Sequence, residues 1–237
     1  LELGGKSPQL VFPDVTDFEN VAANVAIAIF WNMGENCSAG SRLIVHRSVK
    51  DRVLEAVAAE LEGWTVGDPL DPTTKIGAVI SRGHMERVLE YIDIGRKEGA
   101  RVVTGGRQLL EESGGYFVPP TILDLVHNDM RVAQEEIFGP VLSVIEFETE
   151  ADAVAIANDT PYGLAASLYT RDLDIAHRVA RELRAGVVGV NAYSEGDMTT
   201  PFGGHKQSGF GGHDKSLHAH DQYTETKTIW IQLSAAR

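Results

Sequence analysis

Apolar residues recur along the chain with the spacings that distinguish helices from strands. In three long segments, 16–31, 49–61 and 81–98, apolar residues lie three and four positions apart, which predicts helices with one buried face. The segments 150–158 and 173–183 predict two shorter helices in the same way. Each of these helices needs another layer of structure to cover its apolar side.

Short runs rich in β-branched residues lie between the predicted helices, and such runs are typical of strands. They are 9–12, 43–46, 101–103, 141–147, 165–169 and 187–190. A further extended segment, 116–126, is interrupted by Pro119 and Pro120. Because strands alternate with helices, the sequence predicts an α/β fold with a mostly parallel sheet and helices on both faces.

Polar residues mark the start of the first helix. Thr16 and Glu19 match a capping box, in which the threonine hydroxyl and the glutamate carboxylate each accept a hydrogen bond from a backbone N–H group. We therefore expect Thr16 to cap this helix at its N-terminus.

The C-terminal part of the chain loses this regularity. The segment 191–220 is rich in glycine and histidine and has weak periodicity, which in a compact domain indicates a functional or interface loop. The segment 224–233 has strong β propensity but no neighbouring strand in the sequence. We expect it to pair with a sheet edge elsewhere, such as that of a second subunit, and we therefore expect a homo-oligomer.

The only cysteine, Cys37, lies in a polar turn between the first helix and the strand 43–46. A thiol in such a turn is open to a substrate and close to backbone N–H groups, which suits a nucleophile. The alternative is a small buried residue that serves only packing. Gly34 and Gly40 flank the cysteine and no apolar run passes through it, so the sequence favours the nucleophile.

Composition narrows the classes of partner. The chain has 34 acidic against 21 basic residues and a formal net charge of −13, which argues against sequence-independent nucleic-acid binding and against attraction to anionic membranes. No stretch has the apolar length that spans a bilayer. One cysteine allows no internal disulfide, so we expect a reducing compartment, the cytoplasm.

One glycine-rich stretch is similar to the end of a phosphate-binding loop. Residues 4–7 read GGKS, but the earlier glycine of the full motif falls before residue 1, and Pro8 fits poorly with the helix that should follow. No G-x-G-x-x-G follows a predicted strand, so a complete dinucleotide-binding fold is not encoded in these residues.

Two further groupings are weaker candidates for chemistry. The histidines 213, 218 and 220 leave a metal site open as an alternative, although no cysteine accompanies them, and we predict no metal. Glu135 and Glu136 are adjacent carboxylates of the kind that do acid–base work. Successive residues of an extended segment point to opposite sides, however, so at most one of them faces a given site.

Four separated motifs resemble the signatures of NAD(P)-dependent aldehyde dehydrogenases. They are ELGGKSP at 2–8, GENCSAGSR at 34–42, EEIFGPV at 135–141 and PFGGHKQSG at 201–209. They occur in the family's order and extend over the whole chain. Within the family, residues 196–199 and 214–219 are most similar to γ-glutamyl-γ-aminobutyraldehyde dehydrogenases.

The resemblance implies a catalytic mechanism. Cys37 would attack the carbonyl carbon of a small-molecule aldehyde, and the oxyanion of the resulting thiohemiacetal would be held partly by backbone N–H near Cys37. Loss of hydride to NAD(P)+ would leave a thioester. Glu2 would act as the general base that activates water to hydrolyse this thioester.

The resemblance also implies binding roles for four residues. Glu136 would bond the ribose on the nicotinamide side of the cofactor, and Phe138 would pack beside it. Trp31 and Phe202 would line an apolar substrate tunnel, although ordinary packing explains either aromatic residue equally well.

Members of this family are about twice as long as this chain, so the resemblance implies a division into parts. Residues 1–8 would end a dinucleotide-binding domain, 9–221 would form the catalytic domain, and 222–237 would be an oligomerisation tail. NAD(P) would then be bound mainly by a domain outside this chain. Two hypotheses follow: the catalytic half of an aldehyde dehydrogenase, or a non-enzymatic α/β module that retains the thiol and serves assembly.

Overall fold

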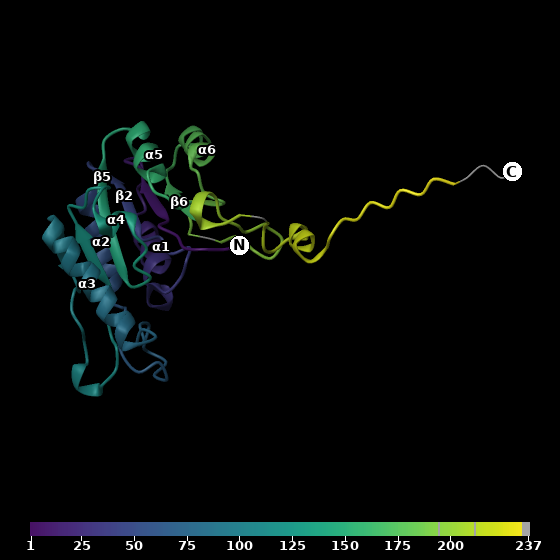
Figure 1. Cartoon of the computed structure of the whole chain (residues 1–237). Helices are drawn as coiled ribbons and strands as arrows, with labels where there is room; N and C mark the ends of the chain where they lie inside the picture. Colours follow the sequence, from purple (N-terminus) through teal and green to yellow (C-terminus); the bar gives the residue numbers. More distant parts are fainter. Residues whose placement is uncertain (194, 211, 234–237) are drawn as a thin grey trace.

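The computed structural model describes residues 1–193, 195–210 and 212–233. Within these residues a seven-stranded sheet forms the centre of the molecule, in the order β3-β4-β5-β2-β1-β6-β7 (Figure 1). The strands are β1 (Pro8–Val11), β2 (Arg42–His46), β3 (Arg101–Thr104), β4 (Thr121–Asp124), β5 (Val141–Phe147), β6 (Ala165–Tyr169) and β7 (Val187–Val190). All neighbouring strands run parallel except β3 and β4, which are antiparallel. The predicted mostly parallel sheet is thus confirmed.

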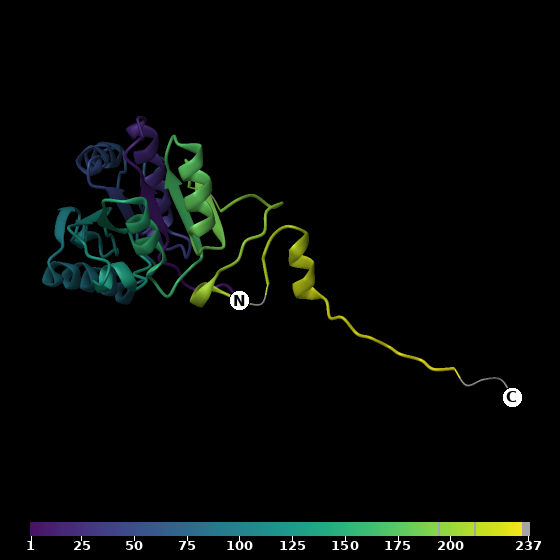
Figure 2. The ribbon, with the colours of Figure 1, turned by 90° about the horizontal axis from the view of Figure 1, so that it is seen from above.

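Helices cover both faces of the sheet, as the alternation of strands and helices predicts. The α-helices are α1 (Phe18–Phe30), α2 (Lys50–Leu61), α3 (Arg82–Glu98), α4 (Arg131–Gln134), α5 (Glu150–Asn158) and α6 (Leu173–Glu182). Short 3-10 helices are η1 (Trp31–Gly34), η2 (Glu111–Ser113), η3 (Lys206–Ser208) and η4 (Leu217–Tyr223). Figure 2 shows the helices lying around the strands. In the described parts of the chain, no helix combines the length and the apolar character that crossing a bilayer requires.

The alternation of side chains along β2 shows which helices lie on which face. Leu43 and Val45 join the apolar cluster formed with α1 and α2. Ile44, between them, points the other way and joins the cluster of α5 and α6. A third cluster packs α3 against β4 and β5 on this second face. Because successive residues of a strand face opposite sides, one continuous apolar run in β2 serves both cores.

The capping residue of α1 differs from the prediction. Asp17, not Thr16, is the N-cap, and its carboxylate accepts a hydrogen bond from the backbone N–H of Asn20 at 3.0 Å. The helix therefore begins one residue later than the predicted capping box requires, which leaves Glu19 out of reach of the N-cap backbone. A complete capping box does occur at α5, where Thr149 and Asp152 bond each other's backbone N–H groups.

Two short elements also differ from the prediction. α4 has four residues and was not predicted, because one helical turn is too short to show helical periodicity. The extended segment 116–126 forms a ladder only at β4, after its two prolines, which have no backbone N–H to donate.

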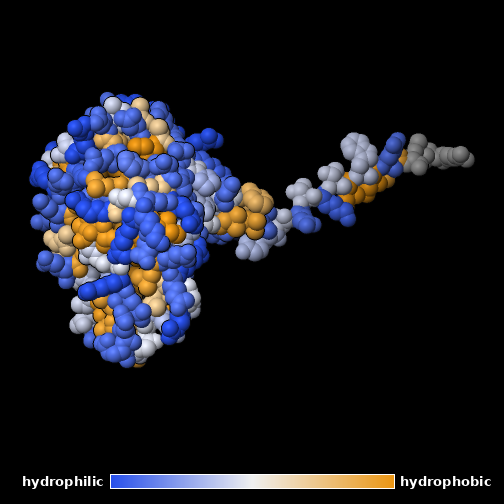
Figure 3. Space-filling view, turned by 60° about the vertical axis from the view of Figure 1, so that its left-hand side comes forward, coloured by the Kyte–Doolittle hydropathy of each residue, from blue (hydrophilic) through white to orange (hydrophobic). Residues whose placement is uncertain are grey.

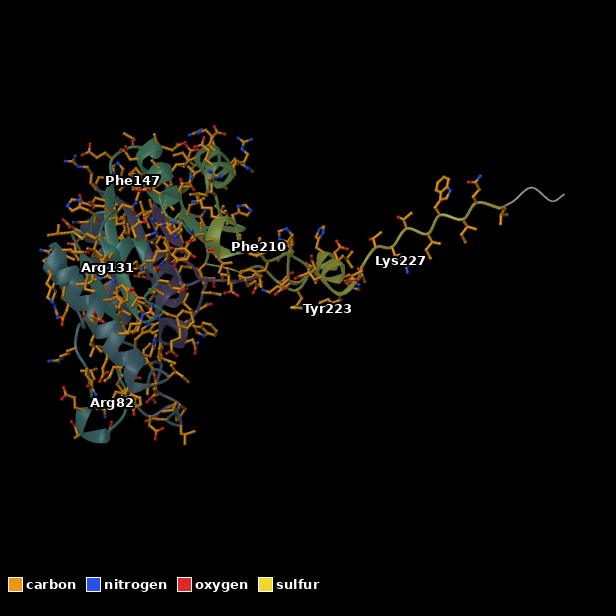
Figure 4. All side chains as sticks on the ribbon, in the orientation of Figure 1. Arg82, Arg131, Phe147, Phe210, Tyr223 and Lys227 are labelled. Atoms are coloured by element: carbon orange, nitrogen blue, oxygen red, sulfur yellow. The ribbon has the colours of Figure 1, made fainter. Side chains whose placement is uncertain are left out.

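The C-terminal segment leaves the body of the molecule. Residues 224–233 form no strand ladder within the described chain, and their side chains lie in solvent, with Trp230 exposed by 88%. Figure 3 shows apolar atoms along this segment, and Figure 4 shows the side chains of Tyr223 and Lys227 well away from the body. Pairing of this segment with another sheet edge stays a prediction, and residues 234–237 of the predicted tail lie outside the described residues.

Candidate active site

The structure places Cys37 in the predicted turn between α1 and β2. The α-helix ends at Phe30, and η1 then reverses the chain with Asn32 and Met33 in the left-handed region, at φ 50° and 56°. Such values are uncommon for residues other than glycine and persist where the surrounding structure enforces them. The thiol of Cys37 is half-buried and forms no disulfide.

Two glycines let the N-terminal segment lie directly against this turn. A Cβ atom at Gly5 would overlap the carbonyl oxygen of Cys37, and one at Gly4 would overlap the carboxylate of Glu136. The backbone N–H of Gly5 donates a hydrogen bond to Glu136 Oε1 at 3.0 Å. Three of the sequence motifs, far apart in the chain, therefore meet at one place, and only glycine permits an approach this close.

The two adjacent glutamates point in different directions, which confirms the prediction made from their spacing. Glu135 bonds Arg131 at 2.7 Å and the hydroxyl of Tyr91 at 2.7 Å. These bonds hold the pKa of Glu135 down at about 2. Glu136 instead turns toward Gly5. Only Glu136 is thus near the thiol turn.

Glu2 lies beside the site, where its backbone forms an isolated antiparallel β-bridge with Gly209. Burial raises the pKa of Glu2 above its ordinary value, and a hydrogen bond with Asp214 raises it further. A carboxylate with a raised pKa is a stronger base, which suits abstraction of a proton from water. Burial raises the pKa of Cys37 most, the charge of Glu195 raises it next, and the charge of Glu2 raises it further. The carboxylate of Glu2 and the thiol of Cys37 therefore interact electrostatically.

A network that the sequence did not reveal holds both neighbours of Cys37. Asn36 Nδ2 donates hydrogen bonds to Tyr193 Oη and to Glu195 Oε1, each at 3.3 Å. Ser38 Oγ lies 2.9 Å from Tyr193 Oη and also bonds the Glu195 carboxylate. Burial raises the pKa of Tyr193 to about 12, so this hydroxyl stays protonated at neutral pH. The loop after β7 thereby fixes the turn that carries the thiol.

The family model described as "Aldehyde dehydrogenase family" matches residues 1–229. The chain belongs to the aldehyde dehydrogenase family. The signature motifs of the sequence and the meeting of three of them around Cys37 agree with this membership.

Individual aldehyde dehydrogenases match nearly the whole chain. An aminoacetaldehyde dehydrogenase of Pseudomonas aeruginosa is 54% identical over 234 residues, which are 99% of this chain and 46% of that protein. An indole-3-acetaldehyde dehydrogenase, solved in complex with NAD+, is 58% identical and has a TM-score of 0.94. This match covers 98% of this chain and 47% of the other chain. A γ-glutamyl-γ-aminobutyraldehyde dehydrogenase of Burkholderia cenocepacia is 54% identical and has a TM-score of 0.91. This match covers 95% of this chain and 45% of the other chain. The chain therefore spans about half the length of these relatives.

The two aromatic residues assigned to a substrate tunnel lie in unlike surroundings. Phe202 is 5% exposed, and the ammonium of Lys215 lies 5.2 Å from the centre of its ring. Trp31, at the start of η1, is 57% exposed. Among the described residues the structure shows no ring contact between them. Their role in a tunnel stays a prediction.

Replacing Glu195 with Gln is expected to lower the pKa of Cys37. Burial raises this pKa most, and the negative charge of Glu195 raises it next. Gln keeps the shape but removes the charge, so the thiolate becomes easier to form. The rate of iodoacetamide labelling, which rises with pH as the thiol ionises, should therefore rise at lower pH in E195Q than in the wild type.

Glu90→Gln, at an exposed position of α3, is the matched control for this charge removal and should leave the labelling curve in place. Superimposable curves for E195Q and the wild type would show that Glu195 does not act on the thiol.

Proposed function

We propose that this chain carries the thiol chemistry of an aldehyde dehydrogenase, the oxidation of an aldehyde to a carboxylic acid. The observation that carries the proposal is the convergence of Cys37, Glu2 and Glu136 through the close approach of Gly4 and Gly5 to the thiol turn. A nucleophile, a general base and a carboxylate positioned for a cofactor are the groups that this reaction requires.

The proposed reaction begins at the sulfur of Cys37. The thiolate forms a bond to the aldehyde carbon, and the carbonyl π electrons move to oxygen, which backbone N–H groups near Cys37 help to stabilise. NAD(P)+, when bound, supplies the acceptor for the hydride that leaves this carbon, and the acyl group then remains on sulfur as a thioester. Glu2 takes a proton from water as the water oxygen attacks the thioester. The carboxylic acid is released and the thiolate is regenerated.

The residues of this chain fit one end of the cofactor. The Glu136 carboxylate receives the Gly5 N–H on Oε1, which leaves acceptor capacity for a ribose hydroxyl, and Phe138 beside it is 37% exposed. No glycine-rich strand-to-helix turn that could bind a pyrophosphate occurs in the sequence. One hydrogen bond to a charged group contributes about 1.5–3 kcal/mol. A micromolar complex requires about 8 kcal/mol, so these 237 residues alone should bind NAD(P) too weakly for turnover.

The test is to join this chain to the N-terminal half of the Pseudomonas aeruginosa relative. The joined protein should reduce NAD+ or NADP+ in the presence of aminoacetaldehyde, the aldehyde in that relative's name. The isolated chain should not reduce NAD+ or NADP+, and calorimetry should show no micromolar binding of NAD+. Iodoacetamide should still label Cys37 in the isolated chain. A folded joined protein without activity would overturn the proposed reaction. Micromolar NAD+ binding by the isolated chain would overturn the division into halves.

We also propose that the chain forms an oligomer through residues 224–233. Ile229, Trp230 and Ile231 are 72%, 88% and 75% exposed, and apolar side chains in such a row are stabilised when the segment pairs with a sheet edge of a second copy. Light scattering should show a mass above that of the monomer, and deletion of 224–237 should lower it. A monomer with the tail present would contradict this assembly.

The proposed compartment is the reducing cytoplasm, which cell fractionation can test.

A further inference from the structure

The lysine of the glycine-rich stretch 4–7, Lys6, is buried inside the molecule, with 1% of its surface exposed. Side chains alternate between the two faces along β1, and Leu10 packs in the apolar cluster of α5 and α6. Lys6 lies four residues before Leu10 and therefore faces the same two helices, which lie beside each other in Figure 1. Lysines are almost never fully buried in proteins unless their charge is paired, so this amine needs a partner within the fold.

Lys6 lines a small cavity at the C-terminal ends of α5 and α6. The cavity has a volume of about 10 Å³, and its wall includes Asn158, the last residue of α5, and Leu183, the C-cap residue of α6. A space of roughly 10–15 Å³ is the smallest that holds one water molecule. An aldehyde or a nucleotide is far too large for it. The cavity therefore admits a single water molecule and excludes organic ligands.

The amine of Lys6 has no hydrogen-bond partner in the described part of the chain. Two other cations at this end of α5 are paired with backbone carbonyl oxygens. Arg42 donates to that of Ala157 at 2.8 Å, and Lys206 donates to that of Asn158 at 2.6 Å. A buried donor without a partner destabilises the folded state, which favours a bound water molecule at the Lys6 amine.

The wall of the cavity offers such a water molecule further partners. Thr160 and Tyr162 line the cavity and carry hydroxyl groups. Burial raises the pKa of Tyr162, and the charge of Glu136 raises it next, so its hydroxyl stays protonated at neutral pH. Buried water molecules are stable where two to four polar groups bond them. Lys6 and these hydroxyl groups together meet that requirement.

The surroundings of Lys6 disfavour its charged form. Burial lowers the pKa of Lys6 most, and the positive charge of Arg42 lowers it next. The negative charges of Glu136 and Glu135 raise it, and the resulting pKa is about 7. Arg184, which lines the cavity at the end of α6, is a further cation on this side. Lys6 therefore changes its charge near neutral pH, whereas a solvated lysine does so near about 10.4.

We propose that the Lys6 amine and one buried water molecule form a proton-binding site at the start of β1. As the pH falls through neutrality, a proton adds to the nitrogen lone pair of Lys6, and the resulting ammonium donates a hydrogen bond to the water molecule. Lys6 directly follows Gly5, whose N–H bonds the Glu136 carboxylate. The site thus places a pH-dependent charge near the carboxylate proposed to hold the cofactor. The inference does not rest on the proposed reaction, because it concerns the folded chain without substrate.

The first test measures how the stability of the 237-residue chain depends on pH. The folded-state pKa of Lys6 lies below its unfolded value, so the unfolded state binds more protons between the two values and stability rises with pH in that window. Between about pH 7.5 and 9.5, the unfolding equilibrium constant of the wild type should fall about 10-fold per pH unit more steeply than that of Lys6→Met. Urea unfolding at each pH measures both constants. Lys97→Met, at an exposed position of α3, is the matched control and should keep the wild-type slope.

Two further measurements examine the site directly. In the folded wild type, the ¹³C chemical shift of Lys6 Cε should titrate with a midpoint near pH 7, and this requires no variant to fold. At a pH where the amine is neutral, oxygen-17 relaxation dispersion should detect one long-lived water molecule fewer in K6M than in the wild type. Parallel pH slopes for the wild type and K6M, or a Lys6 midpoint at the ordinary lysine value, would overturn the proton-binding site. Equal numbers of long-lived water molecules would overturn the bound water.

Discussion

Replacing Cys37 with Ala in the joined protein is expected to lower aldehyde-dependent NAD+ reduction by at least about 10³-fold. Cys37 is the only cysteine of the chain, and no disulfide holds it. Without its sulfur neither the thiohemiacetal nor the thioester can form. The reaction is followed at 340 nm with saturating aldehyde and NAD+.

Cys37→Ser and thermal unfolding provide the controls for this loss. The serine variant keeps the size of the side chain but is a much weaker nucleophile, so it should be nearly as inactive while unfolding at the wild-type temperature. Activity in C37A above about one tenth of the wild type would remove Cys37 from the mechanism and would favour a packing role for the thiol.

Replacing Arg42 with Met is expected to lower the free energy of unfolding by about 3–5 kcal/mol, because buried acceptors lose their donors. Arg42 is fully buried in β2 and donates to the carbonyl oxygens of Lys6, Ile156 and Ala157 at 2.9, 3.0 and 2.8 Å. Burial lowers the pKa of its guanidinium to about 10, so the group remains charged at neutral pH. Methionine fills a similar volume but donates nothing, which leaves these carbonyl groups unpaired.

Urea unfolding followed by circular dichroism measures this effect, with Arg47→Met as the matched control. Arg47 follows the same strand, but its side chain is 59% exposed and pairs with Glu148 on the surface. Its loss should therefore change stability by less than about 1 kcal/mol. Equal stability of R42M and R47M would show that the hydrogen bonds of Arg42 make no net contribution to the free energy of unfolding.

The backbone of the fold could be predicted largely from hydrophobic periodicity. The predicted bounds of 141–147, 150–158, 165–169 and 187–190 are those of β5, α5, β6 and β7. These elements are short runs with clear spacing, and the residue that follows each of them is polar. The one-turn helix α4 and the cap of α1 were missed, because single turns and single hydrogen bonds depend on local geometry that periodicity does not encode.

The site could be predicted only where its residues stand in recognisable motifs. Cys37, Glu2 and Glu136 each belong to a short motif, whereas Glu195 lies in an aperiodic loop and meets Ser38 only because the chain after β7 returns to the thiol turn. The hydrogen bond between His84 and the carbonyl oxygen of Phe138 was hidden for the same reason, because the two residues are 54 positions apart in the sequence.

The most direct measurement is the mass of the peptide that contains Cys37 in a Glu2→Gln variant of the joined protein, quenched after reaction with aldehyde and NAD+. We predict that the thioester forms in this variant but is not hydrolysed, because no base activates water. The Cys37 peptide should therefore carry the acyl group derived from the aldehyde, and the wild type should carry little. An acyl group on another residue, or none on Cys37 while NAD+ is still reduced, would contradict the assignment of Cys37 as nucleophile and Glu2 as base.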